Sequence, residues 1–153
     1  MKGEWCYFKN YFTPEQCQNI LDLGLQISPR KATLGVEGQS VNESYRKSDI
    51  RFIQKQNTKF NFLFDVMWKV AIQANDEFFG FHISKIDYMQ LAEYNSSYQG
   101  EYKKHHDVFW LNNDPYYHRK LTAVIQLTDP SEYDGGDFEV YDALQPLPKE
   151  EIR

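Results

Sequence analysis

Two of the four histidines in this sequence stand side by side, in the stretch His105-His106-Asp107, and an acidic residue follows them at once. In an extended strand, side chains alternate between the two faces, so His105 and Asp107 would point the same way and His106 the other. A histidine and an aspartate on one face supply two ligands of the two-His, one-carboxylate set that holds non-haem Fe(II) and leaves positions open. A metal site built on this pair needs a third ligand from elsewhere in the chain.

Length, composition and net charge limit the class of protein to which this chain can belong. The chain has 153 residues, which suits one domain with its own core. It is 41% hydrophobic and 25% charged, which is typical of a globular chain, and its 16% of aromatic residues favours a β-rich fold. The net charge of −5 gives no global attraction for nucleic acid or an anionic membrane. We expect neither as a partner, although a local basic site stays open.

The two cysteines, Cys6 and Cys17, are too few for a disulfide framework, and we expect reduced thiols. The first residues lack the apolar core of a signal peptide. No run approaches the roughly 20 apolar residues of a membrane span. We therefore expect a soluble, cytoplasmic protein.

Two helices are predicted before the histidine pair. Thr13-Pro14-Glu15-Gln16 is a capping box with proline at the first helical position, and Ser28-Pro29 ends the helix that follows. Residues 58–79 form the clearest helix and end at Gly80. Between the helices, the polar residues 28–49 predict a long surface loop. Three-and-four spacing predicts a core-facing stripe made of Phe60, Leu63, Phe64, Met67, Val70, Ala71, Ala74 and Phe78.

Strands are predicted from residue 50 onward, with turns at 95–100, 112–115 and 134–137. One of the predicted strands carries His105 and Asp107. Helices followed by a run of strands argue for an α+β domain, mainly β, with the helices packed on one side of a sandwich or barrel. The predicted strands are 50–53, one or two within 81–94, 102–109, 121–127 and 138–141.

Five segments, spread in order over most of the chain, carry a family resemblance. They are Asn42…Arg46-Lys47-Ser48, Gln90-Leu91-Ala92-Glu93-Tyr94, Gly100-Glu101-Tyr102-Lys103-Lys104-His105-His106-Asp107, Arg119 to Leu127, and Gly135-Gly136-Asp137-Phe138. Together they resemble the prolyl 4-hydroxylase-like branch of the Fe(II)- and 2-oxoglutarate-dependent dioxygenases. The third segment resembles that family's glycine-tyrosine-His-x-Asp motif. An ordered set of this kind is far more specific than a lone His-x-Asp.

The resemblance implies a double-stranded β-helix, or jelly-roll, core with the N-terminal helices packed outside. His105 and Asp107 would be iron ligands. Tyr94 and Tyr102 match positions near the cosubstrate, and Gln126 falls where some relatives carry a tyrosine that helps hold its distal carboxylate. The implied cofactors are Fe(II) and 2-oxoglutarate, with ascorbate as a further candidate.

The activity implied is oxidative decarboxylation of 2-oxoglutarate to succinate, coupled to hydroxylation of a C–H bond by O2. The expected substrate is a prolyl or other residue in a protein or peptide.

The sequence departs from the family after Asp107. The family takes its second His, and then an Arg or Lys for 2-oxoglutarate, from later strands, and neither appears before Arg153. We therefore expect residues 1–153 to be a single dioxygenase-like domain that is incomplete at its C-terminus. One alternative is a non-catalytic jelly-roll binding or structural module without a complete triad. Another is a hydrolytic metal site that adds His118 to the pair.

Overall fold

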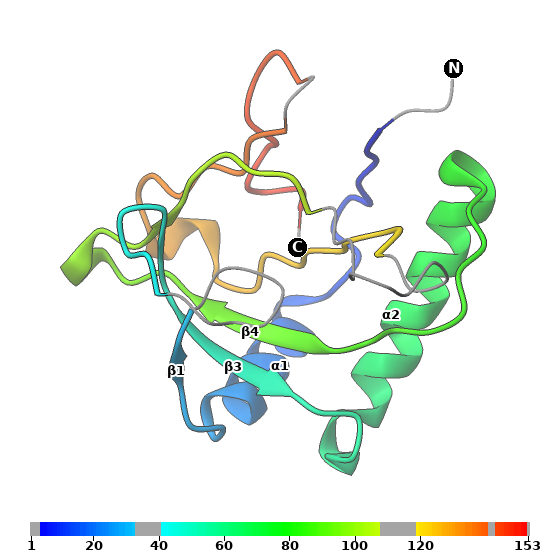
Figure 1. Ribbon diagram of the computed structural model, residues 1–153, viewed down its shortest axis with the longest axis horizontal. Helices are drawn as coiled ribbons and strands as arrows, with labels where there is room; N and C mark the ends of the chain where they lie inside the picture. The colour runs from blue at the N-terminus through cyan, green and yellow to red at the C-terminus, as the bar shows by residue number, and fades with distance from the viewer. Residues whose placement is uncertain (1–3, 33–40, 108–118, 141–142, 153) are drawn as a thin grey trace.

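The computed structural model describes residues 4–32, 41–107, 119–140 and 143–152 (Figure 1). Helices and small antiparallel sheets give the α+β class that the sequence predicts. Single turns of 3-10 helix lie at Thr58–Phe60, Ser96–Tyr98 and Pro130–Glu132, and a π-helical turn lies at Asn75–Phe79. The main elements are α1 (Pro14–Leu25), β1 (Arg30–Lys31), β2 (Arg46–Lys47), β3 (Asp49–Ile53), α2 (Asn61–Ala74), β4 (Met89–Glu93) and β5 (Glu101–Tyr102).

The strands form two antiparallel sheets. The larger has the order β1-β3-β4, and the smaller pairs β2 with β5. In the larger sheet Arg51 lies opposite Leu91, and in the smaller one Arg46 lies opposite Tyr102. Only Ser48 separates β2 from β3, so one nearly continuous extended segment joins the two sheets.

The start of α1 is the one predicted. The Thr13 hydroxyl accepts from the Gln16 backbone N–H, and the Gln16 side chain accepts from the Thr13 N–H, which completes the capping box. Gly24 lies on the buried side, where an added Cβ would stand 2.7 Å from Leu91 Cδ2. The helix therefore packs closely against β4.

The second helix confirms most of the predicted stripe. Phe60, Leu63, Phe64, Met67 and Ala74 are buried, whereas Phe78 is exposed. Phe78 lies in the π-helical turn that ends at Gly80, whose φ is +68°. A π turn adds a residue to the helical repeat, so side chains beyond it rotate off the earlier face. That rotation explains why the stripe fails at its last member.

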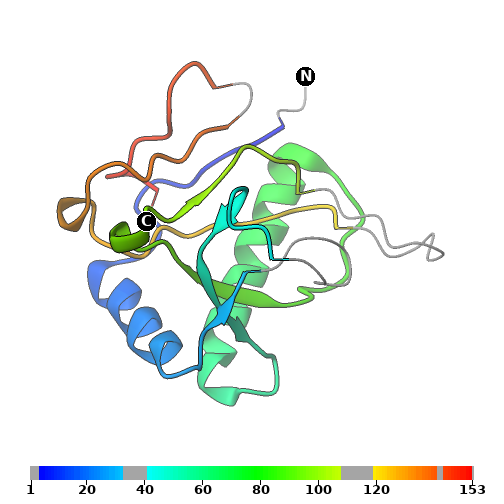
Figure 2. The ribbon, with the colours of Figure 1, turned by 60° about the vertical axis from the view of Figure 1, so that its left-hand side comes forward.

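Both helices cover the same face of the larger sheet (Figures 1 and 2). The core joins Ile20 of α1, Met67 of α2, Ile53 of β3 and Leu91 of β4. Because side chains alternate along a strand, residues of the opposite parity lie on the other face. That second face of the larger sheet carries Ile50 and Phe52, and the same alternation turns Arg46 and Ser48 to that side of the extended segment.

The later predicted strands differ from the structure. Among the described residues of 102–109, only Tyr102 belongs to a strand, and residues 121–127 and 138–140 form none. Ile125 and Leu127 still pack against the core. The apolar residues of this segment therefore predicted its packing against the core. They did not predict its secondary structure, because a strand also needs a hydrogen-bonded partner strand, which composition does not specify.

The polar segment 28–49 also differs from the predicted loop, because β1 and β2 lie at its two ends. The turn at 95–100 is confirmed, with Gln99 in the left-handed region at φ +52°. Gly135 and Gly136 take φ of +69° and +62°, as a tight turn requires. The predicted turn at 112–115 lies outside the described residues.

Both cysteines are free, and Cys17 is buried in the core. Across the ranges that the structure describes, no helix has the length and apolar character needed to cross a membrane.

Candidate metal centre

The loop after β5 brings the predicted ligand pair together. His105 Nε2 lies 3.4 Å from Asp107 Oδ1. Two contacts with Tyr45 hold this loop: Lys103 N–H donates to the Tyr45 carbonyl at 3.0 Å, and the Tyr45 hydroxyl donates to the Lys104 carbonyl at 2.9 Å. The pairing of β2 with β5 thus sets the start of the loop, and Tyr45 fixes its path.

The tautomer of His105 follows from its other nitrogen. Nδ1 lies 2.6 Å from the Lys103 carbonyl oxygen, which can only accept, so Nδ1 carries the proton. In the neutral ring, Nε2 then presents a lone pair toward the Asp107 carboxylate. Two acceptors facing each other accommodate a cation between them, which is either a proton on Nε2 or a bound metal ion. A backbone carbonyl that orients a histidine in this way is the usual outer support of a metal ligand.

The spacing of the pair also fits a metal ion. Two ligand atoms about 2.1 Å from one ion and at right angles to each other lie about 3 Å apart. The 3.4 Å between Nε2 and Oδ1 is close to that separation. Imidazole nitrogen and carboxylate oxygen are donors that suit Fe(II), and Zn(II), Co(II) or Ni(II) can use the same pair.

Arg119 adds a contact that the sequence did not reveal. Its Nη1 lies 3.9 Å from Asp107 Oδ1, and its Nη2 donates to the Tyr88 hydroxyl at 2.6 Å. The guanidinium is therefore fixed from a second side and can orient the carboxylate. In the sequence, Arg119 stands only as part of the basic pair Arg119-Lys120 before an apolar segment. That pattern does not predict a contact with Asp107.

Tyr102 forms the wall of the site. Its ring stacks on the His105 imidazole with centroids 3.6 Å apart and an interplanar angle of 17°. Tyr45 meets the same ring edge-on at 6.0 Å, and the Arg46 guanidinium lies 4.5 Å from its centroid. Burial raises the pKa of the Tyr102 phenol, and the Asp107 carboxylate adds to the rise while Arg46 opposes it. The phenol is therefore a neutral hydrogen-bond donor at physiological pH.

The other two predicted cosubstrate residues lie less close to the pair. Tyr94 is exposed just beyond β4, yet near enough to Tyr102 to add to the rise of its pKa. Gln126 is half-buried, and its backbone N–H donates to the Ile152 carbonyl at 3.4 Å. The structure therefore brings Tyr102 against His105, Tyr94 to the neighbourhood of Tyr102, and gives Gln126 no hydrogen bond to the pair.

The remaining histidines do not join the pair in the described part of the chain. His106 and His82 are exposed, and His118 lies outside the described residues. Within the described ranges, no group of three or more His, Cys, Asp or Glu side chains could hold a metal ion. The structure thus brings the two predicted ligands, His105 and Asp107, together, and no third ligand side chain joins them within the described residues.

Comparison with protein families gives one match that contains this pair. Residues 89–153 match the family model described as "2OG-Fe(II) oxygenase superfamily". This segment is therefore similar to the 2OG-Fe(II) oxygenases. It begins at β4 and contains His105, Asp107, Tyr94, Tyr102 and Gln126. No curated protein and no solved structure matches the chain.

The similarity to the 2OG-Fe(II) oxygenases implies Fe(II) as the cation and 2-oxoglutarate as the cosubstrate. The local geometry fits the metal for two reasons. The protonated Nδ1 leaves Nε2 free to ligate, and the carboxylate faces it at ligand spacing.

Proposed function

We propose that this chain is an Fe(II)- and 2-oxoglutarate-dependent hydroxylase of the prolyl 4-hydroxylase-like branch, acting on a prolyl or other residue of a protein or peptide. The observation that carries the proposal is the His105 Nε2 to Asp107 Oδ1 contact of 3.4 Å inside the segment that matches the oxygenase family. We place residues 1–153 in one domain with a jelly-roll core, because one hydrophobic cluster reaches from Phe12 to Leu127.

Each residue of the site has a defined part in this proposal. The bound metal and 2-oxoglutarate supply the oxidation, in which decarboxylation to succinate is coupled to hydroxylation of a substrate C–H bond by O2. His105 and Asp107 hold the metal. Tyr102 covers the imidazole and keeps water from that side, and Arg119 orients the Asp107 carboxylate. Tyr94, Tyr102 and Gln126 are the proposed contacts of 2-oxoglutarate.

A polypeptide substrate suits the exposure of the site. The side chains of His105 and Asp107 are 26% and 44% exposed, so the pair lies near the surface. A residue carried on a peptide can approach such a site without entering an enclosed cavity. This exposure favours a large substrate over a small molecule that must be surrounded to be recognised.

The direct test is turnover. The protein is incubated with Fe(II), ascorbate, 2-oxoglutarate and a library of proline-containing peptides, and succinate and peptide mass are measured. We expect succinate together with a one-oxygen mass increase in a subset of peptides. His105→Ala and Asp107→Ala should abolish both, while His106→Ala should retain them. Equal succinate from wild type and His105→Ala would contradict the proposal.

The second candidate is a non-catalytic module of the same fold. The absence of a third ligand side chain beside the pair, within the described residues, favours it. In that case the protein would release no succinate with any peptide, yet would still bind a partner through the same face.

A further inference from the structure

Arg46 presents an unusual combination of burial and missing partners. It is only 8% exposed, although it carries a permanent positive charge. Its Nε donates to the Ser48 hydroxyl at 3.2 Å. Its two terminal nitrogens have no hydrogen-bond or ion-pair partner among the described residues. Buried charges are normally paired, because leaving one unpaired is costly.

A second arginine of the same extended segment shows the ordinary arrangement. Arg51 is also 8% exposed, but its Nε donates to the Ile27 carbonyl at 3.0 Å and its Nη1 donates to Glu93 Oε2 at 2.8 Å. The two arginines stand five residues apart and therefore on opposite faces of the extended segment. Arg51 points to the helix-covered face and is satisfied, whereas Arg46 points to the face of the metal pair.

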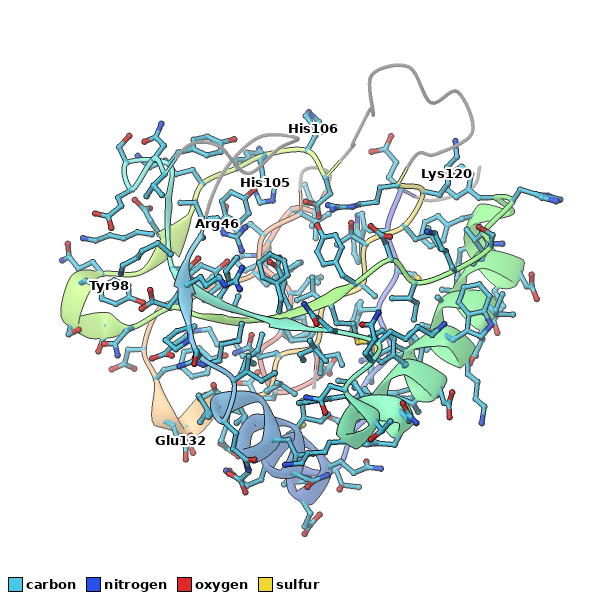
Figure 3. All side chains as sticks on the ribbon, turned by 60° about the horizontal axis from the view of Figure 1, so that its bottom comes forward. Arg46, Tyr98, His105, His106, Lys120 and Glu132 are labelled. Carbon is cyan, nitrogen blue, oxygen red and sulfur yellow. The ribbon has the colours of Figure 1, made fainter. Side chains whose placement is uncertain are left out.

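The position of Arg46 connects it to that pair. Its guanidinium lies 4.5 Å from the centroid of the Tyr102 ring, and the same ring stacks on His105. In Figure 3, Arg46 and His105 lie close together, while Tyr98 and Glu132 lie toward the edge of the molecule. A ligand held by Arg46 would therefore place its other end beside the metal ligands.

The free edge of the guanidinium determines the chemistry of this ligand. Two terminal nitrogens in one plane match the two oxygens of a carboxylate, which they bind through a pair of parallel hydrogen bonds. The aromatic face below the guanidinium holds it in place without consuming its donors. We infer that Arg46 is the anchor of a ligand carboxylate beside the His105–Asp107 pair.

This inference rests on the proposed function only for the source of the carboxylate, which is either 2-oxoglutarate or the molecule to be hydroxylated. Binding is measured by calorimetry, without Fe(II) and again with Zn(II), so no turnover is needed. The probes are 2-oxoglutarate and the pair N-acetylproline and N-acetylprolinamide, which differ in a single carboxylate. A negative result in this binding test would not contradict the proposed oxygenase activity. A negative result in the succinate test would not contradict this inference.

Arg46→Gln should weaken binding of at least one carboxylate probe by roughly 10-fold or more, the scale of a lost charge-assisted bond. Arg46→Lys should give intermediate affinity, because it keeps the charge but loses the paired geometry. Lys47→Gln is the matched control, since it removes one charge from the same strand, and it should bind like wild type. A loss for 2-oxoglutarate identifies the cosubstrate as the source. A lost preference for N-acetylproline over its amide identifies the substrate.

Thermal unfolding provides a second measurement in case a substitution destabilises the fold. Arg46→Met should lower the melting temperature less than Arg51→Met, because Arg46 loses one hydrogen bond, to Ser48, whereas Arg51 loses a hydrogen bond to Ile27 and an ion pair with Glu93. The carboxylate probes should raise the melting temperature of wild type and of Lys47→Gln, but not of Arg46→Met. The inference is overturned if all Arg46 variants bind every probe as wild type does. It is also overturned if wild type binds none of them.

Discussion

At the residue scale, one hydrogen bond decides what the histidine can do. The Lys103 carbonyl fixes the proton on Nδ1 of His105, and the lone pair of Nε2 then faces Asp107. The alternation of side chains in a strand predicted that His105 and Asp107 lie together, although the strand ends at Tyr102. The supporting residues could not be predicted in this way. Tyr45 reaches Lys104 across 59 positions of sequence, and such a contact has no local signal.

Arg119→Gln tests the support of the Asp107 carboxylate. Loss of the guanidinium should let the carboxylate rotate, and affinity for a divalent metal should fall by about 10- to 100-fold, as for other outer supports of metal ligands. Calorimetric metal titration measures the change. Lys120→Gln removes a neighbouring, exposed charge and should leave the affinity unchanged. Equal affinities for the two variants would show that Arg119 does not orient Asp107.

At the element scale, the site depends on a close approach of two backbone segments. An added Cβ at Gly100 would lie 2.8 Å from Tyr94 Cα and from the Asn95 backbone nitrogen. The turn between β4 and β5 therefore closes only with glycine at this position. The sequence motif that begins at Gly100 indicated that this glycine matters. The physical reason, the closeness of the Tyr94 backbone, depends on the three-dimensional structure.

Gly100→Ala should push this turn open, because the obstacle is backbone and cannot move cheaply. We expect a loss of about 1–3 kcal/mol in the free energy of unfolding, measured with urea. Metal affinity should fall as well, since β5 carries the ligand loop. Ser97→Ala, an exposed change in the same turn, should have little effect on either quantity. Wild-type stability in Gly100→Ala would contradict the close approach.

A second element-scale contact ties residues 7–10 to residue 151. Glu151 Oε2 accepts from Lys9 Nζ at 2.7 Å and from the Tyr7 hydroxyl at 3.2 Å, and Asn10 N–H donates to the Glu151 carbonyl. The Lys9 contact lowers the pKa of the Glu151 carboxyl below its ordinary 4.5. This contribution to stability is therefore present above pH 4.5 and is lost as the pH falls through the lowered pKa.

Glu151→Gln should consequently melt below wild type at neutral pH and level with it in strong acid. Both proteins are compared by thermal unfolding across that range. Glu150→Gln, next to it and exposed, serves as the control and should show no such convergence. A constant difference between Glu151→Gln and wild type at every pH would assign the effect to packing rather than to charge.

At the scale of the whole molecule, the structure has two distinct faces. One is the face of the larger sheet that α1 and α2 close over a continuous apolar core (Figure 1), and the other is the side of the smaller sheet that carries Arg46 and leads to the His105–Asp107 pair. Helical periodicity predicted the first face well, because capping and apolar spacing are local properties. The strands at 121–127 and 138–141 were not found among the described residues. Strand pairing joins distant segments, and β-propensity does not encode it.

The central claim is that His105 and Asp107 hold one divalent metal together. Anaerobic titration with Fe(II) in the presence of 2-oxoglutarate, followed by the visible charge-transfer band of the chelate, tests it most directly. We predict one band that saturates at one metal per chain in wild type and in His106→Ala. The band should be lost in His105→Ala and in Asp107→Ala. A band of equal strength in all four proteins, or none in wild type, would contradict the account.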